Sequence, residues 1–156
     1  KSVAAWDLVN RGALRITGDD LFFAITFRTH GEWRPYGVMD AVNKAMDVLL
    51  EELLIKGLTV VVDRTHLSPK SRARVLELAK TYGYRSEAWV WLNADQAQSR
   101  NAARTGRDQV PPEIWLKMVE AFRMPTLSEG FHAVRVMADR HGRLLMDSDG
   151  PVIQKK

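Results

Sequence analysis

The spacing of apolar residues predicts helices that alternate with short strands. Over residues 40–56, apolar positions recur every three or four residues, which is typical of an amphipathic helix, and Gly57 marks its end. Residues 58–62 form a continuous apolar run rich in valine, which is typical of a parallel strand covered on both faces. This alternation predicts the α/β fold class with a mostly parallel sheet.

The same pattern places the other elements along the chain. We expect further helices over 2–10, 21–25, 69–82, 94–104 and 111–122, and strands over 14–17, 86–92, 131–137 and 144–146. The sequence contains no internal repeat and has the length of one domain, so we expect a single domain that spans residues 1–156.

Composition narrows the class of protein. The chain has 156 residues, of which 46% are hydrophobic and 27% charged, and no apolar run reaches the length of a membrane span, which favours a cytoplasmic globular protein. The absence of cysteine excludes disulfides and thiolate metal sites. The formal charge of +4 and an isoelectric point near 9.6 favour a polyanionic partner such as nucleic acid.

The first two residues have the pattern of the end of a phosphate-binding loop. Lys1 and Ser2 precede an apolar helix, as they do in G-x-x-x-x-G-K-[ST], where the lysine reaches the β and γ phosphates of a nucleotide and the hydroxyl holds Mg²⁺. Such a loop follows a strand in the middle of the sheet, whose edges would otherwise be left unpaired. We therefore expect a strand and a glycine loop upstream of Lys1.

Two aspartates follow the predicted strand 14–17. A carboxylate at the C-terminal edge of the sheet, next to a phosphate site, can take the proton from an attacking hydroxyl, and we assign Asp19 as this general base. The alternative is a cap for the next helix, a position that suits Asp20. Two adjacent aspartates allow one to cap and the other to act as the base.

A second acidic residue ends the apolar strand 58–62. Asp63 at this position supports Mg²⁺, directly or through water, or orients the lid arginines, and the alternative is that it accepts hydrogen bonds from backbone amides. Arg64, Thr65 and His66 follow on the loop where a phosphate or base of the substrate would pass. The alternative for His66 is an ordinary turn residue.

Two arginines four residues apart indicate a cationic lid. Arg100 and Arg104 are predicted to lie on one face of a helix, and the residues 105–107 that follow form a glycine-containing hinge. Planar, permanently charged guanidinium groups neutralise the charge that develops on a transferring phosphoryl group. The alternative is a solvated helix face that binds nothing.

An aromatic residue lies among cations in the irregular region 26–36. Trp33 is close in sequence to Arg28 and Arg34, and such a combination is suited to stacking on a base while holding phosphates. The alternative is a partly buried anchor for the loop.

These pieces occur in the order found in a known family. The chain resembles the 5′-hydroxyl polynucleotide kinases of bacteriophages and bacterial RNA-repair systems, within the phosphate-loop kinase superfamily. The matching pieces are Lys1-Ser2, Asp19-Asp20, residues 62–69, Arg100 with Arg104, Val110-Pro111, Phe122 with Pro125, and residues 129–131.

The resemblance implies a fold, a reaction and roles for these residues. The implied fold is a three-layer α/β/α kinase with a helical lid at about residues 94–112. The implied reaction is transfer of the γ-phosphoryl group of ATP to a 5′-OH end of RNA or DNA in nucleic-acid repair. Lys1 and Ser2 would hold ATP and Mg²⁺, Asp19 would be the general base, and Arg100 and Arg104 would be lid cations on the nucleotide.

The sequence departs from the family pattern on the acceptor side. Phe22 stands where the family has an arginine that contacts the phosphate of the substrate, so that Arg28 or Arg15 would have to replace it. The loop after Asp63 also differs from the Asp-Thr-Asn of the phage enzyme. Two alternatives therefore stay open: a phosphate-loop kinase for a small hydroxyl-bearing acceptor, and a non-catalytic module that binds nucleotide or nucleic acid.

Overall fold

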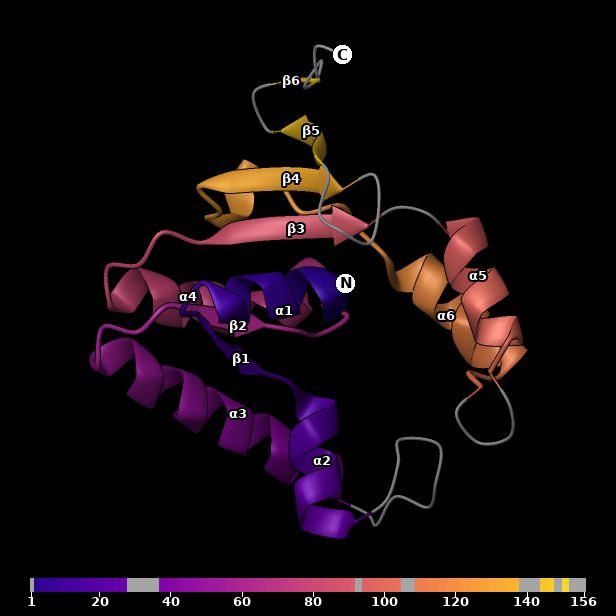
Figure 1. Ribbon diagram of the computed structural model, residues 1–156, viewed down its shortest axis with the longest axis horizontal. Coiled ribbons are helices and arrows are strands. Elements are labelled where there is room, and N and C mark those ends of the chain that lie inside the picture. The colour runs from indigo at the N-terminus through magenta and orange to yellow at the C-terminus, as the bar shows by residue number, and fades with distance from the viewer. Residues whose placement is uncertain are drawn as a thin grey trace.

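The strands of the computed structural model form two sheets (Figure 1). Their bounds are β1 (Leu14–Ile16), β2 (Val60–Val62), β3 (Glu87–Trp91), β4 (Ala133–Met137), β5 (Leu144–Asp147) and β6 (Gly150–Pro151). β1 pairs with β2 and β3 with β4, both in parallel, while β5 and β6 extend the second sheet through antiparallel pairings. The structure describes residues 2–27, 37–91, 94–104, 109–137, 144–147 and 150–151.

The described helices connect these strands. They are α1 (Ser2–Asn10), α2 (Gly18–Thr26), α3 (Val38–Ile55), α4 (Pro69–Thr81), α5 (Ala94–Ala102), α6 (Pro112–Ala121) and the 3₁₀ turn η2 (Leu127–Glu129). Except for α2, each α-helix lies within about two residues of its predicted range at either end, which is the usual uncertainty of helix ends. The predicted α/β class with parallel strands is confirmed.

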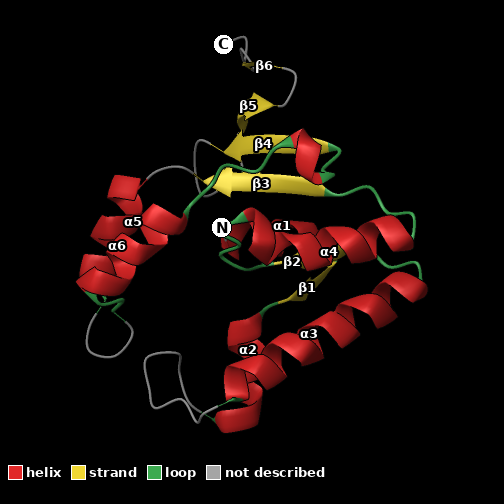
Figure 2. Cartoon of the chain, turned by 180° about the vertical axis from the view of Figure 1, so that it is seen from behind, coloured by secondary structure: helices red, strands yellow, loops and turns green. Residues whose placement is uncertain are grey.

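Helices lie on both sides of the strands. α1 lies in front of the strands in Figure 1, whereas α4 lies in front of them when the molecule is seen from behind in Figure 2. α1 contacts β1 and β2, and α3 contacts β2 and α4. The first sheet is therefore enclosed between α1 and the α3–α4 layer, as in a three-layer α/β/α arrangement.

The core is built on one face of α3. Val42, Met46, Leu50 and Leu54 recur every four residues and are all buried. They pack with Ile16 and with residues of α2 and α4 in one hydrophobic cluster. Burial of this stripe fixes α2 and the C-terminal end of β1 against α3, and so sets the position of the first candidate site residues.

The sheet differs from the prediction in two respects. The described strands form two sheets instead of one, because no described backbone hydrogen bonds join β2 to β3. The three residues of β2 are only half-buried, although the apolar run predicted a strand covered on both faces. A run of valines reports hydrophobicity and β propensity, but not which neighbours pack around the strand. The strand expected upstream of Lys1 stays a prediction.

The segment predicted to form the lid includes α5 and leads into α6. These two helices lie side by side, apart from the other helices, and α6 has no buried residue (Figures 1 and 2). The projecting pair extends to Ala121, and the assignment of residues 94–112 to a lid stays a prediction. None of the helices that the structure describes is long and apolar enough to span a membrane. The assignment of residues 1–156 to a single domain stays a prediction.

Candidate functional site

The N-terminus of α1 is suited to binding an anion. The helix begins at Ser2, and its first turn contains no acidic residue that would oppose the positive end of the helix dipole. Backbone N–H groups of a first helical turn have no partner within the helix and can donate to phosphate oxygens. Lys1 lies outside the described residues, and the predicted contacts of Lys1 and Ser2 with a nucleotide stay predictions.

The two aspartates lie in the first turn of α2, which begins earlier than predicted. The helix starts at Gly18 after the extended Thr17, so that Thr17 is the N-cap residue and Asp20 is not. A Cβ at position 18 would meet the sulfur of Met46 at 3.2 Å. Glycine thus allows α2 to approach α3 closely, and the helix can begin directly after β1. Both Asp19 and Asp20 are exposed.

Arg15 joins the two acidic positions. Its Nε and Nη2 donate to Oδ2 of Asp63 at 3.0 and 2.9 Å, and its Nη1 donates to Oδ2 of Asp20 at 2.7 Å. Burial alone would lower the pKa of Arg15, but its hydrogen bonds and the charges of Asp63 and Asp20 outweigh this effect and raise that pKa. Arg15 therefore stays charged and ties the end of β2 to the start of α2.

Asp63 is a buried member of this cluster. Its side chain is 2% exposed, and its backbone N–H donates to the carbonyl of Ile16 at 3.0 Å, which continues the pairing of β1 with β2. A buried carboxylate needs a charged partner, and Arg15 supplies it. This contact adds a partner to the interpretations of Asp63 made from the sequence, and its predicted role in substrate binding stays a prediction.

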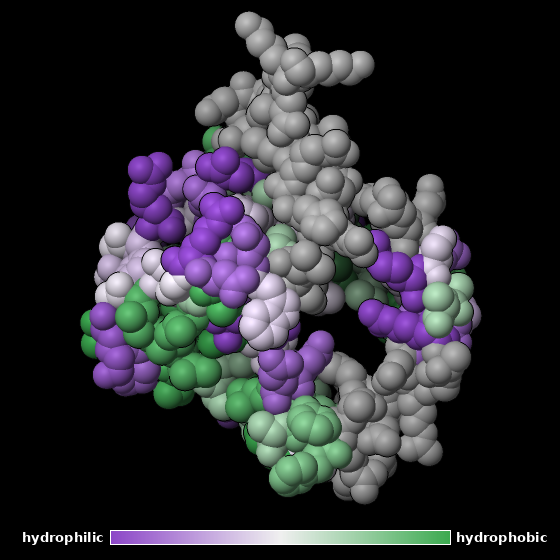
Figure 3. All heavy atoms as spheres, in the orientation of Figure 1, coloured by the Kyte–Doolittle hydropathy of each residue, from purple (hydrophilic) through white to green (hydrophobic). Residues whose placement is uncertain are grey.

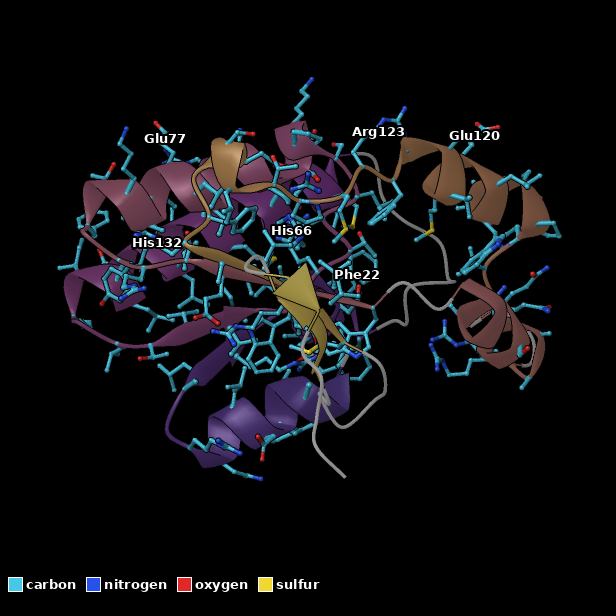
Figure 4. The ribbon with its side chains drawn as sticks, turned by 90° about the horizontal axis from the view of Figure 1, so that it is seen from above. Phe22, His66, Glu77, Glu120, Arg123 and His132 are labelled. Carbon is cyan, nitrogen blue, oxygen red and sulfur yellow. The ribbon has the colours of Figure 1, made fainter. Side chains whose placement is uncertain are left out.

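The loop after β2 is held by contacts to α3 and α4. Arg64 Nη2 donates to Oδ1 of Asn43 at 2.7 Å, whereas Thr65 is exposed. His66 has a positive φ of 40°, and its Nδ1–H donates to the carbonyl of Ser71 at 2.8 Å. Figure 4 shows His66 toward the middle of the molecule, whereas Glu77 of α4 lies at its rim. This backbone conformation and hydrogen bond favour the alternative interpretation of His66, in which it is an ordinary turn residue.

The two arginines predicted for the lid lie at the end of α5. Arg100 is in the last turn of this helix, which ends at Ala102, and the N–H of Arg104 donates to the carbonyl of Asn101 at 3.1 Å just beyond it. The side-chain amide of Asn101 donates to the carbonyl of Val110 and accepts from its N–H, both at 2.8 Å. These two hydrogen bonds hold the end of α5 beside the start of α6.

Both lid arginines are exposed. In Figure 3, hydrophilic side chains of the α5–α6 pair face the gap between this pair and the rest of the molecule. Exposed cations at the end of a projecting helix are compatible with a lid that closes on an anionic substrate. The catalytic roles of Arg100 and Arg104 stay predictions.

The structure bears on which residue could contact the phosphate of the acceptor. Phe22 is 1% exposed and belongs to the core cluster, so this side chain cannot contact a substrate as the family arginine does. Arg28 and Trp33 lie outside the described residues. Of the two cations considered as replacements, Arg15 is therefore the one that the structure places beside the aspartates.

Sequence analysis missed two contacts that hold the site together. The buried Arg72 bonds Glu129 and two backbone carbonyls, one of them that of His66, and so fixes the loop after β2. The bonds of Asn101 to Val110 were missed as well. Neither residue stands in a motif, and the only available signal was an arginine at an otherwise buried position of the α4 pattern.

Among the described residues, no group of three or more histidine or acidic side chains could hold a metal ion by itself. The prediction that the Ser2 hydroxyl and the phosphates of a nucleotide hold Mg²⁺, with support from Asp63, stays a prediction.

Comparison with known proteins supports this picture. A family model described as an AAA domain matches residues 1–125, which include α1, α2, the Arg15 cluster and the lid. No curated protein matches the chain. The residues predicted to carry the chemistry, from Lys1 to Arg104, all fall within the matched part. The chain belongs to this AAA-domain family, which supports a nucleotide-binding, phosphate-loop kinase-like function.

Proposed function

We propose that the protein is an ATP-dependent polynucleotide 5′-hydroxyl kinase that acts on RNA or DNA ends. The observation that carries the proposal is the Arg15 cluster, which fixes the first turn of α2, and with it Asp19, at the C-terminal edge of the sheet. The match to a family of phosphate-loop proteins supports the donor half of the reaction. The net charge of +4 supports a polyanionic acceptor.

The reaction requires one proton acceptor and several cations. The oxygen of the 5′-OH forms a bond to the γ phosphorus, the bond from that phosphorus to the bridging oxygen of ADP breaks, and ADP leaves with the bonding electrons. Asp19 takes the proton of the hydroxyl. Its exposure allows an acceptor to approach within hydrogen-bond distance, and its place in the first turn of α2 sets the position of its backbone.

The nucleotide would be held by the residues at the start of α1. Lys1 and the Ser2 hydroxyl would bind the phosphates and Mg²⁺, and ATP supplies the phosphoryl group when bound. The backbone N–H groups of the first turn would orient these phosphates toward Asp19. Arg100 and Arg104 would neutralise charge on the transferring group once the helix pair closes.

A second candidate is a kinase for a small hydroxyl-bearing acceptor. The burial of Phe22 favours it, because the family contact to the phosphate of the substrate is lost at that position. The loop of Arg64, Thr65 and His66 argues against it, because this loop adds a cation at the end of β2.

Labelling distinguishes these candidates. A kinase for a small acceptor would label that acceptor but not an oligonucleotide. A non-catalytic module would do neither.

The test uses the full-length natural protein with Mg²⁺, γ-labelled ATP and a 5′-OH oligonucleotide. We expect label on the oligonucleotide, a loss of about 10²–10⁴-fold in kcat for Asp19→Asn, and a large loss for Arg104→Ala. Asp40→Asn is the matched control, because Asp40 is also an exposed acid in the first turn of a helix. Absence of label with wild-type protein that still binds ATP would reject the proposal.

A further inference from the structure

A cavity of about 390 Å³ opens between α3 and α4. The side chains that give it its charge are Arg64, Lys70, Arg74 and Asp47. Arg64 comes from the loop after β2, whereas Lys70 and Arg74 are four residues apart on α4 and so lie on one side of that helix. With three cations and one carboxylate, the lining carries a net charge of +2 when the histidine is neutral.

Hydrogen bonds orient two of these cations. Arg64 donates one N–H to Asn43, and Arg74 donates one N–H to Glu77 at 2.9 Å. The Nε of Arg74 also lies 3.9 Å from Oδ2 of Asp47. A guanidinium group has five N–H donors in a fixed plane, so these contacts orient each arginine and leave further donors for an anion. Lys70 is exposed and adds a compact charge on a long, adaptable stem.

The N-terminus of α4 adds to the positive potential of the cavity. This helix has 13 residues and starts at Pro69, with Ser68 as its cap. The hydroxyls of Ser68 and Ser71 also line the cavity, and both take part in the capping box. The side chains and the helix dipole thus favour the same ligand chemistry, a compact group with two negative charges or one of a chain of such groups.

Arg64 links the cavity to the proposed acceptor site. It directly follows Asp63, which Arg15 ties to Asp20 beside Asp19. A polynucleotide that presents its 5′-OH to Asp19 carries its nearest phosphate on the 3′ side of the same nucleoside. The lining of the cavity thus begins one residue from the cluster beside Asp19, and its cations have the charge that this phosphate requires.

We propose that the cavity between α3 and α4 binds this first phosphate of the acceptor strand, through Arg64, Lys70 and Arg74. The inference rests on the proposed function, whose acceptor it defines more closely: a nucleic acid, or at least a nucleoside 3′-monophosphate, and not a bare nucleoside. It supplies the phosphate contact that Phe22 cannot make.

Kinetics with three acceptors test the inference. In Lys70→Ala, KM for a 5′-OH oligonucleotide and for a nucleoside 3′-monophosphate should rise about 10-fold, as expected for one lost charge-assisted contact. KM for ATP, kcat, and KM for the bare nucleoside should not change. Lys80→Ala is the matched control, because Lys80 is an exposed lysine in the last turn of the same helix. An equal rise for all acceptors, or no rise, would overturn the inference.

Binding without ATP separates this inference from the reaction. A nucleoside 3′-monophosphate should bind by titration calorimetry, and Lys70→Ala and Arg74→Gln should each weaken it several-fold. If inorganic phosphate binds equally well, the cavity takes free phosphate and the assignment to the acceptor is wrong. If the nucleotide binds in a Lys70-dependent way but wild-type protein transfers no label, the cavity assignment stands and the proposed kinase activity fails.

Discussion

Arg15 and Arg72 each bind one carboxylate that is far away in sequence, but the surroundings of the two arginines differ. Arg72 is 4% exposed, and its guanidinium binds both carboxylate oxygens of Glu129 at 2.7 and 2.8 Å. Its Nη1 also donates to the carbonyls of His66 and Arg123. The side chain of Arg15 is 19% exposed, and one of its partners, Asp20, is 71% exposed.

The comparison separates a structural ion pair from one that a ligand can reach. The donors of Arg72 are directed at protein oxygens inside the fold, so this cluster joins α4, the loop after β2 and η2. The Arg15 cluster is buried at Asp63 but open at Asp20, beside the predicted base. The exposed charges of the Arg15 cluster can interact with a bound phosphate, whereas the donors of Arg72 are already used within the protein.

The largest effect is expected when the closed network is broken. Arg72→Leu leaves Glu129 with a nearly buried charge and two carbonyls without this donor, and should lower the free energy of unfolding by about 3–5 kcal/mol. Urea unfolding followed by circular dichroism measures this loss. Arg11→Gln is the control: it removes an exposed i,i+4 pair with Asp7 and should cost less than about 1 kcal/mol. A similar small cost for Arg72→Leu would contradict the comparison.

Removal of Arg15 should affect both stability and activity. Arg15→Met removes the charged partner of the buried Asp63 and should lower the free energy of unfolding by about 1–3 kcal/mol. This loss is smaller than that expected for Arg72→Leu, because Arg15 is more exposed to solvent. It should also lower kcat about 10-fold or more, since Asp20 and the first turn of α2 lose their fixed position. Arg15→Lys should restore part of the stability but less of the activity. Unchanged kcat in both variants would assign Arg15 to structure alone.

Acid should weaken the Arg72 cluster first at Glu129. The hydrogen bond from Arg72 outweighs the effect of burial, and further hydrogen bonds with Thr126 add to it, so that the pKa of Glu129 lies below its ordinary value of 4.5. A carboxyl with a lowered folded-state pKa stabilises the fold above its ordinary pKa and loses this contribution as pH falls through the folded value. The contribution of Glu129 to the free energy of unfolding should therefore be constant above about pH 5 and should decrease as the pH falls below 4.5.

Glu129→Gln tests this dependence. The variant should be less stable than the wild type at neutral pH, and the difference between them should shrink as acid protonates Glu129 in the wild type. Unfolding measured by urea titration at several pH values gives this difference. A difference that grows toward low pH would show that the carboxylate is not the stabilising form.

The smallest effect is expected at the cap of α4. Ser68 accepts a hydrogen bond from the Ser71 N–H at 3.3 Å within a capping box, and Ser68→Ala should cost about 1 kcal/mol. Thr65→Ala, an exposed residue three positions earlier, is the control and should change stability by less than about 0.5 kcal/mol. A much larger cost for Ser68→Ala would mean that the cap also holds Arg72 in place.

Much of the fold and part of the site were predictable from local patterns. The apolar repeat of α3, the valines of β2 and the Ser68-Pro69 start of α4 each gave an element of the predicted type. The start of α2 was misjudged, because a short acidic stretch fits a turn as well as a first helical turn and only contact with α3 decides between them. The hydrogen bonds between Asn101 and Val110 could not be predicted for a similar reason, since they are not visible in a helical repeat.

The periodicity, caps and glycines of this chain were sufficient to define its class and the order of its elements, because such signals act between neighbours in sequence. Which charges meet was decided only by the tertiary structure. Arg15 lies 48 positions from Asp63, and Arg72 lies 57 positions from Glu129. Packing of the α3 stripe and strand pairing bring these groups together, and burial then makes the pairing obligatory, since an unpaired buried charge would cost several kcal/mol.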